Sequence, residues 1–458
     1  MKKVVIQGLG FVGSATAVAI ASKLNKSKNP LFDVYGIDLP NKIGKHRVNE
    51  LNNGRFPFKT MDVSISKETK KAHLRKNLKT THSKDVFVDA DIVIISINYD
   101  LNKKDKRKIN LLDFKKSCET IAKKINQNTL VIVQSTIAPG TCEKIIYPIF
   151  KKNLLRRKID INSFWLAHSY ERVMPGKDYL NSIINYWRVY SGINKTSAKK
   201  CKEFLSNLVN VKKYPLIELE STTASEIAKI LENSYRAVNI AFIEEWARFA
   251  EDIEIDLFEI INAIRRRPTH SNIMQPGFGV GGYCLTKDPL FASAAAKQIF
   301  NLDNHNFPFS SSAVKINNLM PIVTLNKLIK HFDKDIKNKN ILLMGVSYRE
   351  EIADTRYSPS EIFYKKANKL GAKITPQDPL VNYWDETGLE VISDIPDLKS
   401  YDAVVFAVQH NEYKNISFKR ILKSNKNLLI FDANKVLTDK QIRYLKTRTN
   451  VKFLSIGR

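Results

Sequence analysis

Short hydrophobic runs alternate with amphipathic stretches in the first part of the chain. Residues 4–7 have the pattern of a buried strand, residues 14–24 that of a helix, and residues 32–37 that of a second strand. Strand, helix and strand in this order predict a βαβ unit with parallel strands. Similar runs predict three more strands, at residues 92–97, 129–134 and 164–168. The N-terminal part is therefore expected to form an α/β sheet.

The same pattern starts again near residue 341. Four hydrophobic runs predict strands there, at residues 341–345, 372–375, 403–408 and 428–431. Residues 360–370 predict a helix between two of them, and Gly371 stands where a glycine commonly follows a helix end. The C-terminal part thus repeats the α/β pattern, but it lacks the GxGxxG motif that follows the first strand at residues 8–13.

A long helix is predicted between the two α/β parts. The sequence Thr223-Ala224-Ser225-Glu226 has the pattern of a capping box, and the helix should continue to about Asp252. Thirty residues at 1.5 Å each give roughly 45 Å, enough to connect two domains. Because its apolar residues lie on more than one face, more than one face must be buried, and we expect this helix to form the seam of a homodimer.

Composition narrows the class of protein. The chain has 458 residues, 43% of them hydrophobic, enough for two or three domain cores. No hydrophobic run reaches the length of a membrane span, and the first strand meets Gly8 too early for a signal peptide. The four cysteines show neither paired nor metal-binding spacing. We therefore expect no metal site and a reducing, cytoplasmic location.

The net charge of +28 calls for an explanation. Nucleic acid is the first partner to consider, but the lysines are scattered among asparagines, and neither a basic helix nor an RNA-binding signature stands out. A lysine-rich solvated surface explains the charge as well, and its field would favour an anionic substrate. We expect no nucleic-acid partner and no membrane insertion.

Three glycines follow the first predicted strand and open the helix after it. Gly8 would make the turn, Gly10 would admit a pyrophosphate to the helix N-terminus, and Gly13 would let helix and strand pack closely. Asp38 ends the next strand, 25 residues past Gly13. A carboxylate there binds a ribose 2′-hydroxyl and repels a 2′-phosphate. The cofactor is therefore expected to be NAD and not NADP.

A second glycine-rich stretch, residues 279–288, carries a different chemistry. Three glycines precede Cys284, and a lysine and Asp288 follow it. Glycines allow positive φ or close approach of a ligand, and a thiol in a partly cationic turn can act as a thiolate nucleophile. The alternative is a turn whose cysteine packs as a small hydrophobic residue.

Polar side chains at predicted strand ends give further candidates. Thr136 follows one strand, and Glu171 and Arg172 follow another, where open α/β sheets place their ligand contacts. A surface ion pair between Glu171 and Arg172 is the alternative. Lys229 and Asn233 lie four residues apart on one face of the long helix, although solvated polar residues are the ordinary occupants of such a face.

Arg349 and Arg356 flank the first loop of the C-terminal α/β part. Two guanidinium groups there could hold a phosphate through charge-assisted hydrogen bonds. Surface arginines without a ligand are the alternative.

With these residues laid out, the chain resembles the UDP-glucose/GDP-mannose dehydrogenase family, the NAD-dependent nucleotide-sugar 6-dehydrogenases. The likeness runs from residue 4 to residue 458. It rests on motifs in a shared order, namely Gly8-Gly10-Gly13, Ser135-Thr136 with Pro139-Gly140-Thr141, Glu171-Arg172-Val173 with Pro175-Gly176, Lys229 with Asn233, Gly281-Gly282 with Cys284 and Asp288, Gly345 with Tyr348, Asp354 and Arg356, and Asp378-Pro379.

The resemblance implies a fold, a reaction and a division of the chain. The fold would be α/β, with two doubly wound Rossmann-like domains joined by the long central helix. The chain would divide into an NAD-binding domain (residues 1–215), a central helical and dimerisation domain with the cysteine loop (216–320) and a UDP-sugar-binding domain (321–458). The reaction would be a twofold oxidation of the C6 hydroxyl of a nucleotide sugar to the uronate, for surface polysaccharide synthesis.

The resemblance also assigns roles by position. Cys284 would hold the aldehyde as a thiohemiacetal and then as a thioester, Lys229 and Asn233 would stabilise the oxygen that becomes negative, and Asp288 and Glu171 would direct water and protons. Thr136 would lie beside the reacting carbon and contact the cofactor. The other expected contacts are Gly8, Gly10, Phe11, Val12, Gly13 and Asp38 for the cofactor, and Arg172, Gly281, Tyr348, Arg349 and Arg356, together with Lys229 and Asn233, for the substrate.

The chain departs from the family pattern at several of these places. Tyr170 precedes the glutamate where the family often has proline, Thr286 replaces a common proline, and Arg349 replaces a common lysine. Glu171-Arg172-Val173 with the following Pro-Gly resembles the branch that acts on UDP-N-acetylhexosamines, although Tyr283 replaces the histidine common in the UDP-ManNAc group.

Two other functions remain open at this point. A β-hydroxyacid dehydrogenase also combines a dinucleotide fold with a Lys-x-x-x-Asn helix, but it needs neither Cys284 nor a second α/β part. A basic nucleic-acid-binding protein with a vestigial dinucleotide fold would show salt-sensitive DNA or RNA binding without NADH production.

Overall fold

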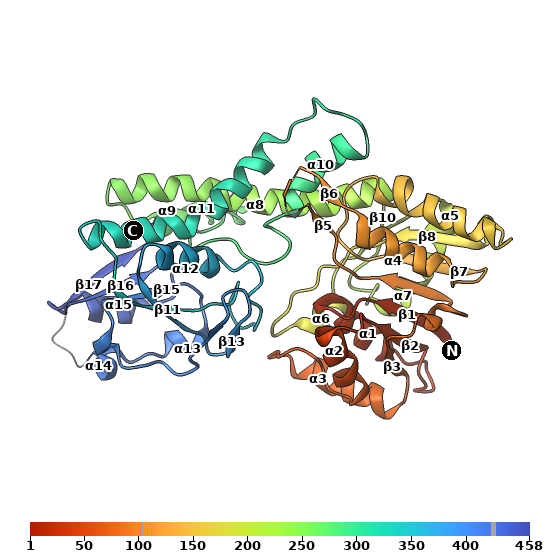
Figure 1. The fold of residues 1–458 in the computed structure, drawn as a ribbon, viewed down its shortest axis with the longest axis horizontal. Coiled ribbons are helices and arrows are strands. Elements are labelled where there is room, and N and C mark those ends of the chain that lie inside the picture. Colours follow the sequence, from red (N-terminus) through yellow and green to blue (C-terminus); the bar gives the residue numbers. More distant parts are fainter. Residues whose placement is uncertain (103, 106, 423–426) are drawn as a thin grey trace. The chain divides into compact units, whose positions relative to one another are not determined.

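The computed structural model describes residues 1–102, 104–105, 107–422 and 427–458. The described chain forms two compact units, each with its own sheet (Figure 1). The first unit contains residues 1–232 and 290–307, and the second contains residues 233–289 and 308–458. The boundary between them therefore falls inside the long helix α8 (Thr222–Asp252). The three-part division expected from the sequence remains a prediction.

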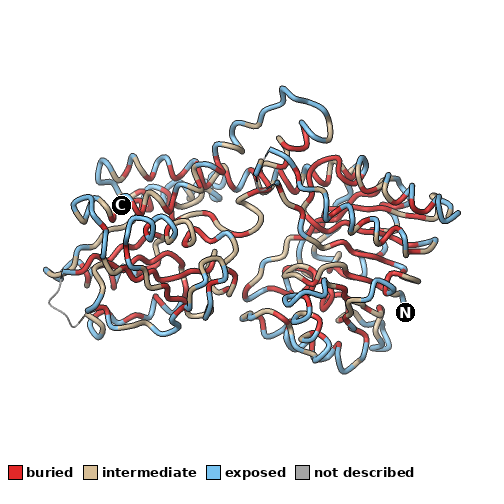
Figure 2. Tube along the Cα trace, viewed as in Figure 1, coloured by how far each residue is buried: buried red, intermediate tan, exposed pale blue. Residues whose placement is uncertain are grey.

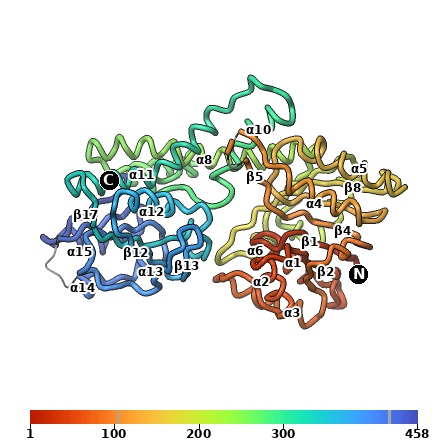
Figure 3. Tube along the Cα trace, in the orientation of Figure 1, coloured from red at the N-terminus to blue at the C-terminus, as the bar shows by residue number. Residues whose placement is uncertain are grey.

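The first unit is built on an eight-stranded sheet with the order β10-β9-β8-β7-β4-β1-β2-β3. All pairings are parallel except that of β8 with β9. The order reverses between β1 and β4, which is the topological switch point where doubly wound sheets bind ligands at the carboxyl ends of their strands. Figure 3 shows β1 (red) inside this sheet although it begins the chain.

Alternating side chains of the central strands explain the layers of this unit. Val4 and Ile6 pack into a core on one face of the sheet, and Val5 packs into a core on the other. Helices α1, α3, α6 and α7 cover the first face, and α4, α5 and α10 cover the second. Because both faces are covered, the central strands consist almost wholly of apolar residues. Figure 2 shows these strands buried.

The main elements of the first unit have the following bounds: β1 Lys2–Gln7, α1 Phe11–Ala21, β2 Phe32–Ile37, α2 Lys42–Asn52, α3 Val63–Leu74, β3 Leu78–Thr81, β4 Ile92–Ile95, β5 Asp100–Leu101, β6 Ile109–Asn110, α4 Leu112–Ala122, β7 Thr129–Val133, α5 Tyr147–Arg156, β8 Phe164–His168, α6 Tyr179–Ile184, β9 Val189–Gly192, α7 Lys195–Leu208, β10 Ile217–Glu218 and α10 Phe291–Gln298. The predicted strands are all present. The first helix begins and ends three residues earlier than predicted, and Leu24, its predicted last residue, lies outside it and bridges Pro30.

The second unit has a five-stranded parallel sheet with the order β12-β11-β15-β16-β17. This is the order of the other common doubly wound fold, and its switch point lies between β11 and β15. Ile341 and Leu343 point into one core, with α11 and α12, while Leu342 and Met344 point into the other, with α13, α14 and α15. The expected pair of doubly wound sheets is therefore confirmed.

The elements of the second unit after α8 are α9 Leu257–Ile264, α11 Pro308–His331, β11 Asn340–Met344, α12 Pro359–Lys369, β12 Lys373–Gln377, β13 Tyr383–Trp384, β14 Leu389–Glu390, β15 Ala403–Phe406, α13 Asn411–Lys414, α14 Phe418–Ile421, β16 Leu428–Asp432, α15 Asp439–Lys446 and β17 Val451–Ser455. Gly371 follows α12 with a φ of 85°, as predicted. Among the described residues, no helix is long and apolar enough to cross a membrane.

The predicted capping box at the start of α8 is wrong. The helix begins at Thr222, and the Ser221 hydroxyl accepts a hydrogen bond from the backbone N–H of Ala224. Glu226 does not turn back toward the helix start. Its carboxylate accepts the backbone N–H groups of Gly140 and Cys142, in the loop after β7. A tertiary contact thus takes the side chain that the local pattern assigned to a cap.

Candidate active site

The loop after β1 has the geometry of a dinucleotide site. Gly8 has a φ of 92°, and a Cβ built there would lie 2.4 Å from the Ser96 carbonyl oxygen. A Cβ on Gly13 would lie 1.8 Å from the Gly8 oxygen, whereas one on Gly10 would meet nothing within 4 Å. The first and third glycines are therefore required by packing, and the second leaves open space beside the N-terminus of α1. These are the three roles that a bound pyrophosphate requires.

Asp38 lies at the end of β2, beside this loop. Its carboxylate accepts the backbone N–H groups of Leu9 at 3.3 Å and of Leu39 at 2.8 Å. It also forms an ion pair with Arg47 at 3.2 Å. The carboxylate is thereby fixed next to the glycine loop, in the position from which it can bind a ribose hydroxyl.

The other expected cofactor residues surround the same strand ends. Phe11 stacks on Phe58 with ring centroids 4.0 Å apart, and Val12 lies beside it, half-buried, in the first turn of α1. Thr136 is half-buried in the loop after β7. The adjacent Ser135 accepts the Ile97 N–H at 2.9 Å and so ties this loop to the loop after β4. The loops after β1, β2, β4 and β7, which are the candidate cofactor loops, all belong to the first unit.

Glu171 and Lys229 also meet in the first unit. The Lys229 Nζ donates to the Glu171 carbonyl oxygen at 3.0 Å, and both side chains are buried. Arg172 does not pair with Glu171. It forms an ion pair with Glu232 and donates to the Trp187 carbonyl oxygen at 3.0 Å. The alternative of a surface ion pair between Glu171 and Arg172 is therefore excluded.

The cysteine turn of the second unit is a single helical turn. The Cys284 carbonyl oxygen accepts the N–H groups of Lys287 at 3.2 Å and of Asp288 at 2.9 Å. Asp288 is fully buried, and its two oxygens have different partners: Lys287 Nζ at 2.9 Å and Asn233 Nδ2 at 2.8 Å. The carboxylate thus joins the cysteine turn to helix α8. A buried, paired carboxylate one turn from a thiol can orient a water molecule and accept its proton.

The glycines before the cysteine bring this turn against the first loop of the second sheet. A Cβ on Gly281 would lie 2.8 Å from Pro359 Cδ and from Tyr348 Cβ, and one on Gly282 would lie 2.8 Å from the Tyr348 ring. Burial raises the pKa of Tyr348, and the charges of Asp354 and Cys284 act in the same direction. Side chains at these glycines would push the nucleophile turn away from the strand-end loop, so the absence of side chains keeps the two together.

Arg356 and Arg349 have different surroundings in that loop. Arg356 forms a two-pronged ion pair with Asp354, with Nε–Oδ1 at 2.9 Å and Nη2–Oδ2 at 2.7 Å. Its guanidinium carbon also lies 6.0 Å from the ring centroid of Tyr283. Within the described part of the chain, Arg349 forms its ion pair with the neighbouring Glu350, at 3.3 Å. Arg356 is therefore oriented beside the cysteine turn, and Arg349 remains at the half-exposed edge of the loop.

Two polar features were not predicted from the sequence. Lys287 pairs with Asp288 and lies 4.1 Å from the Tyr283 ring centroid. His410 Nε2 lies 3.2 Å from Asp378 and 3.1 Å from the Ser347 hydroxyl. Burial alone would raise the pKa of Asp378, but His410 and backbone N–H groups lower it. This buried network holds the loops at the switch point of the second sheet; the Asp-Pro pattern was its only sequence signal.

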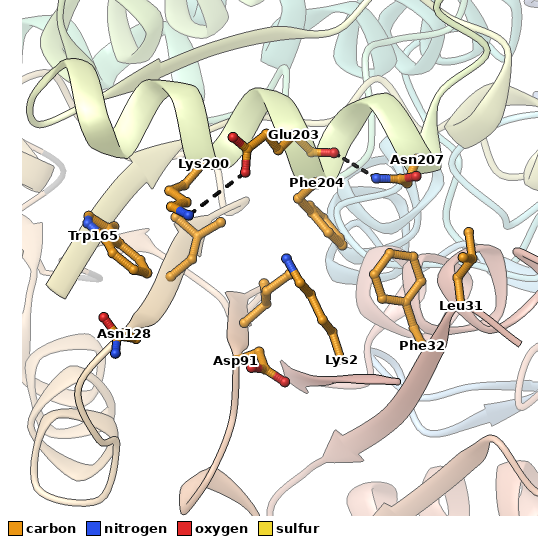
Figure 4. Close-up of a pocket in the computed structure, with 12 residues that line it drawn as sticks. Lys2, Leu31, Phe32, Asp91, Asn128, Trp165, Lys200, Glu203, Phe204 and Asn207 are labelled. Carbon is orange, nitrogen blue, oxygen red and sulfur yellow. Dashed lines mark hydrogen bonds and ion pairs between the residues drawn. The ribbon is translucent and has the colours of Figure 1, made fainter. Parts of the chain in front are cut away.

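A cavity of about 510 Å³ lies elsewhere in the first unit (Figure 4). It is lined by residues at the amino ends of the strands and by helix α7, among them Lys2, Phe32, Trp165, Lys200 and Phe204. The cofactor loops lie at the carboxyl ends of the same strands and contribute none of its lining. This cavity is therefore separate from the dinucleotide site.

Comparison with known proteins agrees with this geometry. Family models match the chain in three segments: the NAD binding domain of the UDP-glucose/GDP-mannose dehydrogenase family over residues 2–209, its central domain over 223–319 and its UDP binding domain over 342–439. The UDP-N-acetyl-D-mannosamine dehydrogenase of Methanocaldococcus jannaschii is 31% identical, over 95% of this chain and 93% of that protein.

Two solved structures extend the comparison to the fold. The structure of UDP-D-ManNAc dehydrogenase from Pyrococcus horikoshii has a TM-score of 0.82 at 25% identity, covering 100% of this chain and 99% of that one. The NDP-N-acetyl-D-galactosaminuronic acid dehydrogenase from Methanosarcina mazei has a TM-score of 0.77 at 25% identity, covering 100% and 95%.

Fold, dinucleotide loop and cysteine turn together define an NAD-dependent oxidoreductase with a nucleotide-binding second sheet. The chain belongs to the UDP-glucose/GDP-mannose dehydrogenase family. NAD is its cofactor, and its C-terminal part is the UDP binding domain of that family.

Proposed function

We propose that this enzyme oxidises the C6 hydroxyl of a UDP-N-acetylhexosamine twice, giving the uronate for surface polysaccharide synthesis. The observation that carries the proposal is the cysteine turn, in which Asp288 joins Lys287 to Asn233 one turn away from Cys284. The similarity to UDP-N-acetyl-D-mannosamine dehydrogenases supports an acetamido sugar. Glu171-Arg172-Val173 with the following Pro-Gly supports the same branch.

NAD, when bound, accepts a hydride in each of the two oxidations. Lys229 and Asn233 donate hydrogen bonds to the sugar oxygen as it gains negative charge. Thr136, in the loop after β7, would help to hold NAD beside the reacting carbon. The Cys284 thiolate adds to the aldehyde carbon and forms a thiohemiacetal, whose second oxidation leaves a thioester.

Hydrolysis of the thioester completes the reaction. Asp288 and Glu171 orient a water molecule and take its proton as it attacks the thioester carbon. The C–S bond breaks, the uronate leaves, and the Cys284 thiolate is restored. Over the cycle one alcohol, two NAD and one water molecule give one carboxylate, two NADH and three protons.

Residues around the cysteine turn and at strand ends bind the substrate. Arg356 holds the nucleotide sugar with a guanidinium already oriented by Asp354. Arg349, Tyr348 and Gly281 belong to the same loops. Arg172 contributes from the loop after β8. Charge-assisted hydrogen bonds from arginine suit the pyrophosphate of a UDP-sugar.

We further propose a cytoplasmic homodimer that does not use nucleic acid as a partner. The part of α8 in the second unit exposes a row of aromatic side chains: Tyr235, Phe242, Trp246 and Phe249 are each about half exposed. They recur at spacings of seven, four and three residues, which places them along one side of the helix. A second copy of the helix would cover this row. Cysteines without paired spacing suit a reducing compartment.

The test is an NADH assay with a panel of UDP- and GDP-linked sugars, UDP-ManNAc, UDP-GlcNAc, UDP-glucose and GDP-mannose included. We expect the highest kcat/KM with a UDP-N-acetylhexosamine, and two NADH for each uronate. One NADH per turnover with a small hydroxyacid would support the β-hydroxyacid alternative. DNA or RNA binding that weakens with salt, without any NADH formation, would support the nucleic-acid alternative.

A further inference from the structure

We propose that Tyr170 is a positioning residue for Lys229, and that its ring holds the ammonium group in place without consuming a hydrogen-bond donor. The inference rests on the proposed function in one respect: that Lys229 donates a hydrogen bond to the sugar oxygen as this oxygen gains negative charge. Tyr170 stands where family members often have proline. It is 1% exposed and lies two residues past the end of β8.

The contacts of Tyr170 join the loop after β8 to two residues of helix α8. The Lys229 Nζ lies 5.3 Å from the centroid of the Tyr170 ring, a cation–π distance. At the other end of the ring, the hydroxyl donates to Glu232 at 3.1 Å. Lys229 and Glu232 are three residues apart on the same helix, so one tyrosine fixes both.

The backbone of the same loop fixes the tyrosine in turn. The Tyr170 carbonyl oxygen accepts a hydrogen bond from the buried Arg188 at 3.1 Å. The next carbonyl, that of Glu171, accepts from Lys229 at 3.0 Å. Arg172 lies on the Tyr170 ring at 5.6 Å and forms an ion pair with Glu232. The ring therefore has neighbours on its face and at its hydroxyl that determine its orientation.

A ring suits this place better than a carboxylate because of how each attracts an ammonium. A carboxylate would accept the N–H groups of Lys229 directly and would compete with the substrate oxygen that becomes negative. The face of an aromatic ring attracts the positive charge through its quadrupole and accepts no conventional hydrogen bond. Burial, with Glu232 acting in the same direction, raises the pKa of Tyr170 to about 12, so the hydroxyl stays neutral.

The test compares Tyr170→Phe, which keeps the ring, with Tyr170→Leu, which removes it. Tyr190→Phe and Tyr190→Leu are matched controls, since Tyr190 is equally buried in the same unit and its hydroxyl also donates to a glutamate, Glu218. Steady-state kcat and KM for NAD and the UDP-sugar are measured below the Tm of every variant.

We expect Tyr170→Leu to lower kcat by about tenfold, the size of a lost desolvated cation–π contact, with little change in the KM for NAD. Tyr170→Phe should keep kcat within about threefold of the wild type, because it removes one hydroxyl hydrogen bond that lies away from the reacting atoms. Equal losses of kcat in the Tyr170 and Tyr190 leucine variants would overturn the proposal, because they would indicate a general effect of a core cavity.

A second measurement does not depend on turnover. In protein labelled at the ε-carbon of lysine, the Lys229 methylene should show an upfield ring-current shift in the NMR spectrum, assigned by its loss in Lys229→Arg. The shift should persist in Tyr170→Phe and vanish in Tyr170→Leu. A Lys229 signal without such a shift would overturn the inference even if the enzyme oxidises UDP-sugars. Conversely, a chain that shows the shift but oxidises no nucleotide sugar would refute the proposed function alone.

Discussion

The Glu226 carboxylate lies 2.8 Å from the backbone nitrogen of Cys142, although 84 residues separate them in the chain. It accepts the backbone N–H groups of Gly140 and Cys142, which lie at the start of the helical segment after β7 and have no partner inside that helix. Three residues further along α8 stands Lys229, and six residues before Cys142 stands Thr136. One buried glutamate therefore ties the helix that carries Lys229 to the loop that carries Thr136.

The first prediction concerns stability and pH. Burial raises the pKa of Glu226 to about 8, so between pH 4.5 and 8 the folded chain holds a proton that the unfolded chain has lost. The contribution of Glu226 to the free energy of unfolding is fully present below pH 4.5 and is lost as the pH rises from 4.5 to 8. The glutamine in Glu226→Gln cannot ionise. In this variant the free energy of unfolding should therefore decrease by roughly 3–5 kcal/mol less than in the wild type as the pH rises. Thermal unfolding at pH 5.5 and 8.5 measures the effect.

The exposed Glu245 on the same helix provides the matched control for Glu226. Glu245→Gln should keep the wild-type difference in Tm between the two pH values. If Glu226→Gln keeps that difference as well, Glu226 is ionised in the folded chain throughout this range and its pKa is not raised.

The second prediction is that Cys284 is the covalent relay. The wild type should form two NADH per uronate. Cys284→Ser should accumulate a sugar-linked enzyme, since its oxygen ester hydrolyses more slowly than a thioester. Cys284→Ala should lose uronate formation and at most interconvert alcohol and aldehyde. NADH counting and intact mass spectrometry measure these outcomes. Free aldehyde as the wild-type product, or full uronate formation by the alanine variant, would remove Cys284 from the mechanism.

The third prediction concerns the choice between NAD and NADP. Asp38 should favour NAD by binding the ribose hydroxyls and repelling a 2′-phosphate. Asp38→Ala removes that carboxylate and leaves its partner Arg47, now available to a phosphate. We expect kcat/KM for NADP to rise by about tenfold or more relative to that for NAD. The double variant Asp38→Ala/Arg47→Ala should lose this gain. Equal kcat/KM for the two cofactors in the wild type would contradict the role of Asp38.

The fourth prediction is that Arg356 binds the substrate. Its guanidinium is already held by Asp354, so little ordering is needed on binding. Arg356→Ala should lower kcat/KM for the nucleotide sugar by about ten- to a hundredfold, the loss expected for a charge-assisted hydrogen bond of about 1.5–3 kcal/mol. The exposed Arg448 of the same unit is the control, and Arg448→Ala should change little. A folded Arg356→Ala enzyme with wild-type kinetics would rule out this contact.

The fifth prediction concerns assembly. A dimer that covers the aromatic row on α8 should be weakened by Trp246→Glu, because a charge would be buried in the interface without a partner. Light scattering coupled to gel filtration at micromolar concentration should show a dimer for the wild type and a monomer for the variant. Tyr383→Glu, at an exposed aromatic residue on β13, should remain dimeric. A monomeric wild type would count against the proposed interface.

Much of the fold was determined by local sequence. Val4 and Ile6 pack into one core and Val5 into the other, because successive side chains of a strand point to opposite faces of the sheet. A continuous apolar run in the sequence is therefore enough to predict a strand that is buried on both faces. Gly8, Gly10 and Gly13 were predicted with their separate roles because each role follows from the lack of a side chain. Cys284 and Asp288 were also singled out from the sequence by their place after three glycines, and the structure shows that they lie one turn apart.

The tertiary structure alone decided what the buried polar side chains do. Glu226 has the spacing of a capping box, but a loop 84 residues away takes its carboxylate. Tyr170 was only a departure from a pattern until folding placed its ring against Lys229. The physical reason is the same in both cases: burying a polar or charged group is costly unless partners are close. Those partners come from whichever segments the sheet brings together, and spacing along the chain does not specify them.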